Sequence, residues 1–234
     1  MIIDATHQDW VMIGISIIII FATLSTVFLL KLIGLERWQI RKIGHMVINT
    51  VAAFFPLLFE NFIDLIITLS IAIGFLLLLS AIPKIRILQR IFMMCSRKES
   101  FPWELFINAV VMGIAMLLIL WFFRDNLFVF TAAYLTVSLG DGLGEMIGRP
   151  YGRIKYKIFN EKSLEGSVAV FVGTLVGLII AIAIGHMLGE VGVLWKIIVI
   201  ALMATIVEAF SVWFLDNITL PATVAIAMYL FFLL

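Results

Sequence analysis

The chain has 234 residues, of which 64% are hydrophobic and only 13% are charged, and its mean hydropathy is +1.19. A soluble domain of this length carries roughly 25% charged residues, so these values exclude an ordinary water-soluble fold and predict an integral membrane protein. The formal net charge of +1 says nothing about partners by itself, since the distribution of charge matters more than its sum, and no nucleic-acid partner is expected.

Apolar runs of roughly 17–25 residues are candidate transmembrane helices. Eight such runs follow one another in the chain: 11–31, 43–59, 62–82, 104–123, 127–147, 166–188, 193–214 and 218–234. The second run is short, and the eighth is either a full span or a half-span. Because no linker rich in Gly, Ser and Pro separates the runs, residues 1–234 are expected to form a single integral-membrane domain. The predicted fold is an all-α, multi-pass bundle of about eight transmembrane helices.

The basic residues predict how this bundle is oriented. Fourteen of the 16 Lys and Arg residues fall in the segments 31–42, 84–98 and 149–162, which lie on one side if there are eight spans. The opposite side holds only Arg124 and Lys196. Since basic loops stay in the cytoplasm, these three segments are expected to face the cytoplasm and both termini the other side. The segment 84–98 is either a simple anchor or an amphipathic helix that contacts anionic membrane lipids.

An acid interrupts the fifth run. Asp141 lies in the sequence SLGDGLGE, residues 138–145, and ionisable residues inside a membrane are costly and usually functional. If the run stays helical, Asp141 and Glu145 share a face, where their oxygens can ligate one hard cation. The alternative is a buried acid paired with a base. Gly140, Gly144 and Gly148 form a glycine stripe, which either admits a neighbouring helix or exposes backbone N–H groups to phosphate.

A possible anion site precedes the sixth run. Ser163 is expected to cap this helix, with Glu165 and Gly166 in its first turn. Lys162 stands next to the cap, and a helix N-terminus with a nearby lysine is suited to binding an anion. The alternative is ordinary capping beside an anchoring lysine. The residue order is not that of a Walker A loop.

Two other runs bring polar residues to the same side. Arg41, His45 and Asn49 recur at intervals of four at the start of the second run, and Lys42 stands beside them. This spacing predicts a polar stripe that enters the membrane from the cytoplasm.

Glu208 is the acid of the seventh run, and it stands eight residues before Asp216, as Asp141 stands eight before Arg149. At about 1.5 Å per helical residue, both acids are expected about 12 Å below the loops. A shared metal or phosphate site is therefore geometrically possible.

In this order, the polar blocks resemble the CTP-dependent polyprenol kinase family, which includes dolichol kinase, phytol kinase and a CTP-using diacylglycerol kinase. The resemblance is carried by Arg41-Lys42-x-x-His45, by Gly140-Asp141 with Gly148-Arg149 and Gly152, by Lys162-Ser163-x-Glu165-Gly166-Ser167, and by Glu208 with Asp216-Asn217 and Pro221. The run 155–160 looks closer to the phytol-kinase branch. The chain departs from the family at Gly144, where alanine is common.

The resemblance implies that the γ-phosphate of CTP passes to a lipid alcohol, such as phytol, a polyprenol or dolichol, with the help of Mg²⁺. The catalytic residues it implies are Asp141, Glu208, Lys162 and His45, and the implied metal ligands are Asp141, Glu145 and Glu208. Either Glu208 or Asp141 would accept the hydroxyl proton. The implied nucleotide-binding residues are Arg41, Lys42, Gly140, Arg149, Ser163, Glu165, Gly166, Ser167, Asp216 and Asn217.

Two other functions share the membrane setting. A cytidylyltransferase would use CTP to activate a lipid phosphate, and would release pyrophosphate. A transporter or flippase would place its polar groups near the midplane, commonly in inverted repeats. Here the polar groups gather towards one face and no repeat is evident, which favours an enzyme. The oligomeric state is not predicted.

Overall fold

The computed structural model describes residues 32–59, 61–81, 103–212 and 215–234, together with scattered positions between 11 and 30. The predicted span 11–31 lies largely outside the described residues. The segment 84–98, with its predicted anchor or amphipathic helix, lies wholly outside them.

The described chain is mostly helical, and its helices coincide with the second to eighth apolar runs. The helices are α2 (Arg37–Phe54), α3 (Phe62–Ala81), α5 (Trp103–Phe122), α6 (Leu127–Leu135), α7 (Gly142–Tyr151), α8 (Leu164–Ile184), α9 (Val193–Phe210) and α10 (Asp216–Phe232). A short 3₁₀ turn, η1 (Phe55–Leu58), follows α2, and a π-helical segment, η2 (Thr136–Asp141), joins α6 to α7.

Three of the described helical stretches are long and apolar enough to cross a membrane: Leu127–Tyr151, which comprises α6, η2 and α7, then α8 and α9. The surface agrees with this setting. Val168, Val172, Val176 and Ile179 form a stripe of exposed apolar side chains along α8, which would be unfavourable in water. These helices support insertion into a membrane, whereas the eight spans, the single domain and the orientation stay predictions.

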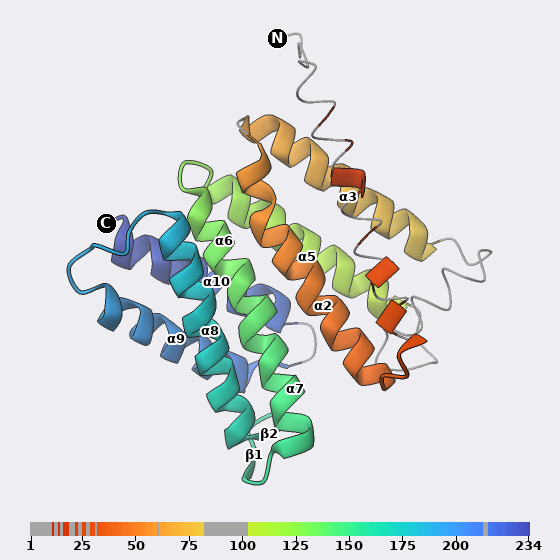
Figure 1. Ribbon diagram of the computed structural model, residues 1–234, viewed down its shortest axis with the longest axis vertical. Coiled ribbons are helices and arrows are strands. Elements are labelled where there is room, and N and C mark those ends of the chain that lie inside the picture. Colours follow the sequence, from red (N-terminus) through yellow and green to blue (C-terminus); the bar gives the residue numbers. More distant parts are fainter. Residues whose placement is uncertain are drawn as a thin grey trace.

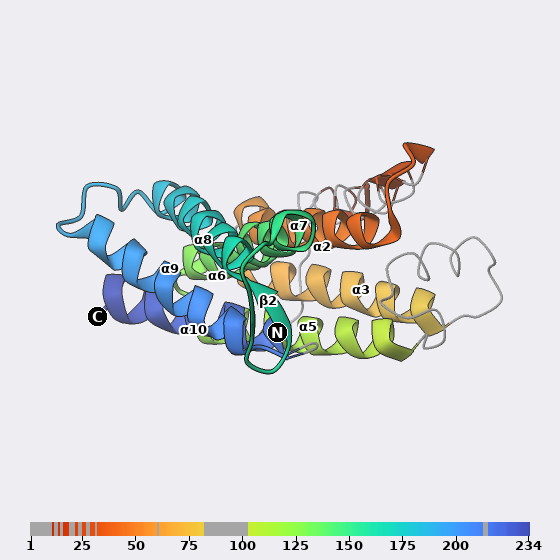
Figure 2. The same ribbon diagram turned by 90° about the horizontal axis from the view of Figure 1, so that it is seen from below.

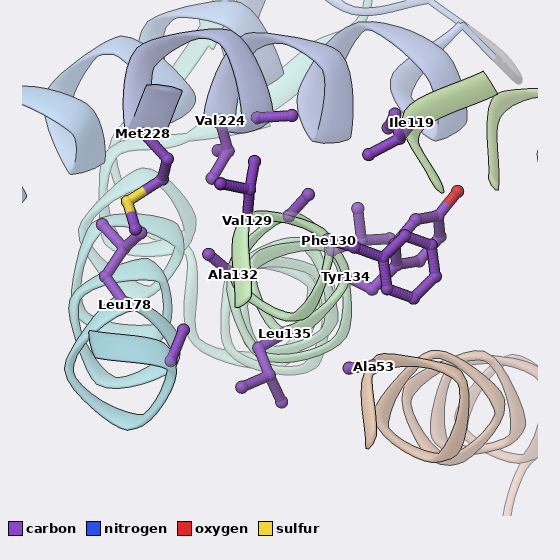
Figure 3. Close-up of a cluster of buried hydrophobic side chains, with 14 of the residues drawn as sticks. Ala53, Ile119, Val129, Phe130, Ala132, Tyr134, Leu135, Leu178, Val224 and Met228 are labelled. Atoms are coloured by element: carbon purple, nitrogen blue, oxygen red, sulfur yellow. The ribbon is translucent and has the colours of Figure 1, made fainter. Parts of the chain in front are cut away.

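The helices form two layers around α6. In Figure 2, α8, α7 and α2 lie in one layer, and α9, α10, α5 and α3 lie in the other. The helix α6 packs against α8 and α2 of the first layer and against α10 of the second. Figure 3 looks along α6 and shows its side chains among Leu178 of α8, Val224 and Met228 of α10 and Ala53 of α2. Every residue of α6 from Val129 to Leu135 is buried, so this helix is the centre of the hydrophobic core.

Glycines determine how closely α8 approaches η2 and α7. A Cβ atom on Gly144 would lie 2.5 Å from Val170 Cγ2, and one on Gly148 would lie 3.0 Å from the Cα of Gly166. On the facing helix, a Cβ atom on Gly173 would lie 2.4 Å from the carbonyl oxygen of Leu139. The interpretation of the glycine stripe as a packing surface is therefore confirmed.

The all-α prediction missed one element. The basic loop after α7 folds into an antiparallel hairpin of β1 (Lys155–Lys157) and β2 (Glu161–Ser163), with Tyr156 opposite Lys162. Figure 1 shows the hairpin at the end of the molecule where α7 and α8 meet. In β1 only the central residue is partly buried, whereas β2 runs from the exposed Glu161 to the buried Ser163. Runs of three residues were too short to reveal these strands in the sequence.

Candidate active site

The helix α2 runs antiparallel to the α6–η2–α7 stretch, and polar contacts join the two at successive levels. Lys42 pairs with Asp141, while the Ser138 hydroxyl donates to the Met46 carbonyl oxygen at 2.7 Å. Deeper along α2, the Thr131 hydroxyl donates to the Ala53 carbonyl oxygen at 2.9 Å. The residue numbers rise along α2 as they fall along the α6–η2–α7 stretch. This ladder of three contacts therefore shows which residues of the two helical stretches lie at the same level.

Lys42 holds two acids at once. Its Nζ atom lies 2.8 Å from Asp141 Oδ2 and 3.3 Å from Glu145 Oε2, and only 4% of its side chain is exposed. Arg41 forms a further ion pair with Glu145. A buried charge is tolerated only when it is paired and hydrogen-bonded, so these contacts explain how both carboxylates are accommodated. They also confirm that Asp141 and Glu145 share a face, and that Asp141 is paired with a base.

The π-helical segment η2 ends at Asp141 itself. Such a segment adds a residue to an α-helical turn and often occurs at functional sites. One extra residue rotates all that follows by about 100° relative to an uninterrupted α-helix. The face that Asp141 and Glu145 present to α2 therefore depends on this insertion, which no periodicity in the sequence indicated.

A second ion pair comes from the hairpin. Lys162 Nζ lies 2.6 Å from Glu208 Oε1 and also donates to the Glu208 carbonyl oxygen. On the other strand, the Tyr156 and Ser167 hydroxyls are 2.6 Å apart, which ties the hairpin to α8. The prediction that Glu208 lies about 12 Å inside its helix was wrong, because α9 ends at Phe210. Glu208 therefore lies two residues from the end of its helix rather than well inside a longer span.

The two ion pairs belong to one charged cluster. Asp141 interacts electrostatically with Lys162 as well as with Lys42, and Glu208 interacts with both Asp141 and Lys42. Asp216, the first residue of α10, adds a further attraction on Lys42. Side chains from α2, η2, α7, β2, α9 and α10 thus meet. They bring together six of the predicted residues: Lys42, Asp141, Glu145, Lys162, Glu208 and Asp216.

Several other predicted residues have structural partners here. Ser163 caps α8 by accepting a hydrogen bond from the Gly166 N–H at 3.2 Å, as predicted. Glu165 accepts from the Ile154 N–H, and Arg149 lies over the Trp38 ring at 4.7 Å. The Arg149 contact joins α7 to α2, and the Glu165 contact joins the start of the hairpin to α8.

Three predicted nucleotide-binding residues remain. Gly140 packs against α8, where a Cβ atom would lie 2.6 Å from Thr174 Oγ1. Ser167 bonds to the hairpin, as described above, and the Asn217 N–H is bonded to the Asp216 carboxylate at 2.9 Å. A nucleotide would have to displace the last two contacts in order to bind these groups.

The acids can be compared with what a divalent cation needs. Within the described part of the chain, no three His, Cys, Asp or Glu side chains gather closely enough to hold a metal ion. However, Asp141 and Glu145 already share one cation, the ammonium of Lys42. Since Mg²⁺ is commonly bound by one or two carboxylates together with water and substrate phosphates, this pair fits a nucleotide-bound Mg²⁺. Glu208 lies beside a different cation, Lys162, so its predicted role as a ligand has less support.

Sequence reasoning assigned no role to several residues that shape the cluster. The Ser138 and Thr50 hydroxyls are 2.6 Å apart and join η2 to α2. Tyr156 supports the strand that carries Lys162. Isolated Ser, Thr and Tyr residues in apolar or basic stretches carry no signal of their partner, and only the fold identifies it.

Comparison with known proteins gives one partial relative. No family model matches the chain, and no solved structure matches it. The chain is similar to a probable phytol kinase, chloroplastic, of Triticum aestivum, with 31% identity over 126 residues. The match covers 51% of this chain and 42% of the Triticum aestivum protein, so the chain spans less than half the length of that relative. This match supports a family of the polyprenol- and phytol-kinase type.

Proposed function

We propose that this protein is a membrane-embedded kinase that transfers the γ-phosphate of CTP to the hydroxyl of an isoprenoid alcohol such as phytol or a polyprenol. The observation that carries the proposal is the charged cluster around Lys42, Asp141 and Glu208, built at one end of apolar helices. The similarity to a probable phytol kinase supports the reaction class and the acceptor. The choice of CTP rests on the family resemblance of the sequence.

Phosphoryl transfer is catalysed mainly by positioning and by neutralising charge. Arg41, Lys42 and Lys162 are the bases of the cluster, and each now pairs with a carboxylate. When a nucleotide binds, we expect these bases to move from the carboxylates to phosphate oxygens, which carry more charge. The exchange keeps each buried base paired and so avoids an uncompensated charge.

The acids divide into two roles. Asp141 and Glu145 converge on one cation position and would hold Mg²⁺, which when bound offsets the charge on the phosphates. Glu208 is then free to accept the proton of the alcohol while the alcohol oxygen forms a bond to the γ-phosphorus. The bond from that phosphorus to the β–γ bridging oxygen breaks, and CDP leaves. His45, at 3.5 Å from Asp141, lies where the acceptor would approach.

The orientation predicted from the basic residues would place this chemistry at the cytoplasmic surface. The bases of 31–42 and 149–162 flank the cluster in sequence, and basic loops stay in the cytoplasm. Cytoplasmic CTP and an alcohol anchored in the bilayer would then meet at this end of the bundle.

The products test the proposal. Purified protein in lipid nanodiscs is incubated with CTP, Mg²⁺ and a panel of alcohols that comprises phytol, farnesol, geranylgeraniol, dolichol and diacylglycerol. We expect CDP and a lipid phosphate with at least one isoprenoid alcohol. Pyrophosphate and a CDP-lipid, formed from a lipid phosphate instead, would establish the cytidylyltransferase alternative and refute the kinase.

A further inference from the structure

We infer that Asn49, with His45 one turn above it on α2, forms the binding site for the hydroxyl group of the lipid acceptor. The inference rests on the proposed function and deepens it, because it places the acceptor on the membrane side of Asp141. No catalytic, metal-binding or nucleotide-binding role was predicted for Asn49.

The first observation is an unsatisfied hydrogen-bond acceptor. Asn49 is completely buried, and its Nδ2 atom donates to the His45 carbonyl oxygen at 2.8 Å. Its Oδ1 atom is buried and has no hydrogen-bond partner among the described residues. Buried polar atoms are nearly always hydrogen-bonded, and an unpaired one is unfavourable enough to need an explanation. A ligand that donates a hydrogen bond would supply the missing partner.

A second unsatisfied atom lies on the same helix face. His45 Nε2 is buried and lies 3.5 Å from Asp141 Oδ2, but it makes no hydrogen bond to any residue that the structure describes. Residues four apart lie one above the other on a helix, so His45 Nε2 and Asn49 Oδ1 belong to successive turns of one face. A hydroxyl group both donates and accepts, and one hydroxyl therefore suits this combination of an imidazole nitrogen and a carboxamide oxygen.

The third observation is depth. Along the ladder that joins α2 to η2, Lys42 is level with Asp141, whereas Met46 and Thr50 are level with Ser138. Asn49 therefore lies at the level of Ser138, farther from the cytoplasmic end than Asp141. An alcohol whose chain lies in the bilayer would meet Asn49 and His45 before its hydroxyl reached the phosphates at Asp141.

The chemistry of these two residues also selects the class of ligand. Asn49 carries no charge, and the nearest bases on α2, Arg41 and Lys42, pair with acids one to two turns closer to the cytoplasm. A neutral hydroxyl can be buried against a carboxamide at little cost, whereas a phosphate monoester would need paired cations at that depth. The site is therefore specific for a lipid alcohol and unsuited to a lipid phosphate.

The test measures binding without a nucleotide. Labelled phytol is bound to the protein in nanodiscs, and it is competed with unlabelled phytol or with the same hydrocarbon lacking the hydroxyl. The wild type is expected to prefer the alcohol. In Asn49→Leu, loss of the hydrogen bond should reduce this preference by about five- to tenfold.

The matched control is Asn108→Leu on α5. Asn108 Oδ1 is also buried and has no partner in the described part of the chain, but α5 packs mainly against α3 and α10 rather than against α2. This variant should keep the wild-type preference. Asn49→Thr is a second probe, since threonine can still donate to the carbonyl four residues earlier but lacks the carboxamide oxygen. It reports on the site even if Asn49→Leu does not fold.

Three results would overturn the inference: no preference for the alcohol in the wild type, an unchanged preference in both Asn49 variants, or an equal loss in Asn108→Leu. The result is separable from the proposed function. If the preference depends on Asn49 but no phosphate is transferred from CTP, the proposed function alone fails. If phosphate is transferred but the preference ignores Asn49, this inference alone fails.

Discussion

Replacing Lys42 with methionine is expected to destabilise the protein strongly and to make its stability depend on Mg²⁺. Methionine fills a similar volume but has no charge. In the variant, Asp141 and Glu145 would face each other without the ammonium group that now lies 2.8 and 3.3 Å from their oxygens.

The magnitude follows from these distances. With an effective dielectric constant of about 20, unit charges at these separations attract by ~6 and ~5 kcal/mol. Desolvation of the ions offsets much of that attraction, and removing one partner of a buried ion pair costs about 3–5 kcal/mol in practice. For a chain of this length, the melting temperature should fall on the order of 10 °C. Mg²⁺ at about 100 times its dissociation constant should restore ~2.7 kcal/mol.

The assay is thermal unfolding in detergent, with Mg²⁺ or with EDTA. Lys196→Met is the matched control, because Lys196 also pairs with a carboxylate, Glu190, at 3.1 Å. Since a third of the Glu190 side chain is exposed, this loss should be below about 1 kcal/mol and independent of Mg²⁺. A Lys42→Met protein as stable as the wild type, or one that Mg²⁺ leaves unchanged, would refute the idea that the two acids share a cation position.

Three further predictions concern the cluster and its support. Asp141→Asn should abolish CTP-dependent phosphorylation while the protein still inserts and folds, and retained activity would exclude its role in holding the metal. Gly173→Ala should lower the free energy of unfolding by about 1–3 kcal/mol through overpacking, because the added Cβ atom would lie 2.4 Å from a backbone oxygen of η2. Gly189→Ala is the control, since its Cβ atom would meet no described atom within 4 Å. Equal melting temperatures of the two variants would contradict this packing. Lys162→Gln should raise the KM for CTP at least about tenfold, as expected for a lost charge-assisted contact. Lys157→Gln, on the exposed side of β1, should leave this KM within about twofold. Similar KM values for the two variants would exclude Lys162 from the nucleotide site.

Much of this arrangement could be predicted from local patterns. The apolar runs located seven described helical stretches, with α6, η2 and α7 counted as one. They did so because burial in a membrane leaves a strong compositional signal. The four-residue spacing of Arg41, His45 and Asn49 predicted a polar face correctly, and the cap at Ser163 was found from residue type and position. Each of these features depends on residues close together in the chain.

The rest depends on the tertiary structure. Nothing near Lys42 in the sequence indicates that its partner is Asp141, 99 positions away. The π-helical segment η2 packs against α2 and α8, which are distant in the sequence. Glu208 was predicted too far from the end of its helix, because the apolar run continues beyond Phe210, where the helix ends. The partner of each buried charge, the rotation of a helix after a π-helical segment and the residue at which a helix ends are therefore seen only in the fold.

The position of the transferred phosphate tests the central claim most directly. The protein in nanodiscs is given phytol, Mg²⁺ and CTP that carries a radioactive label on either the α- or the γ-phosphate, and the lipid fraction is counted. The kinase account predicts that the γ-label enters the lipid and the α-label stays in solution as CDP. Label from the α-phosphate in the lipid, or no label from either, would contradict it.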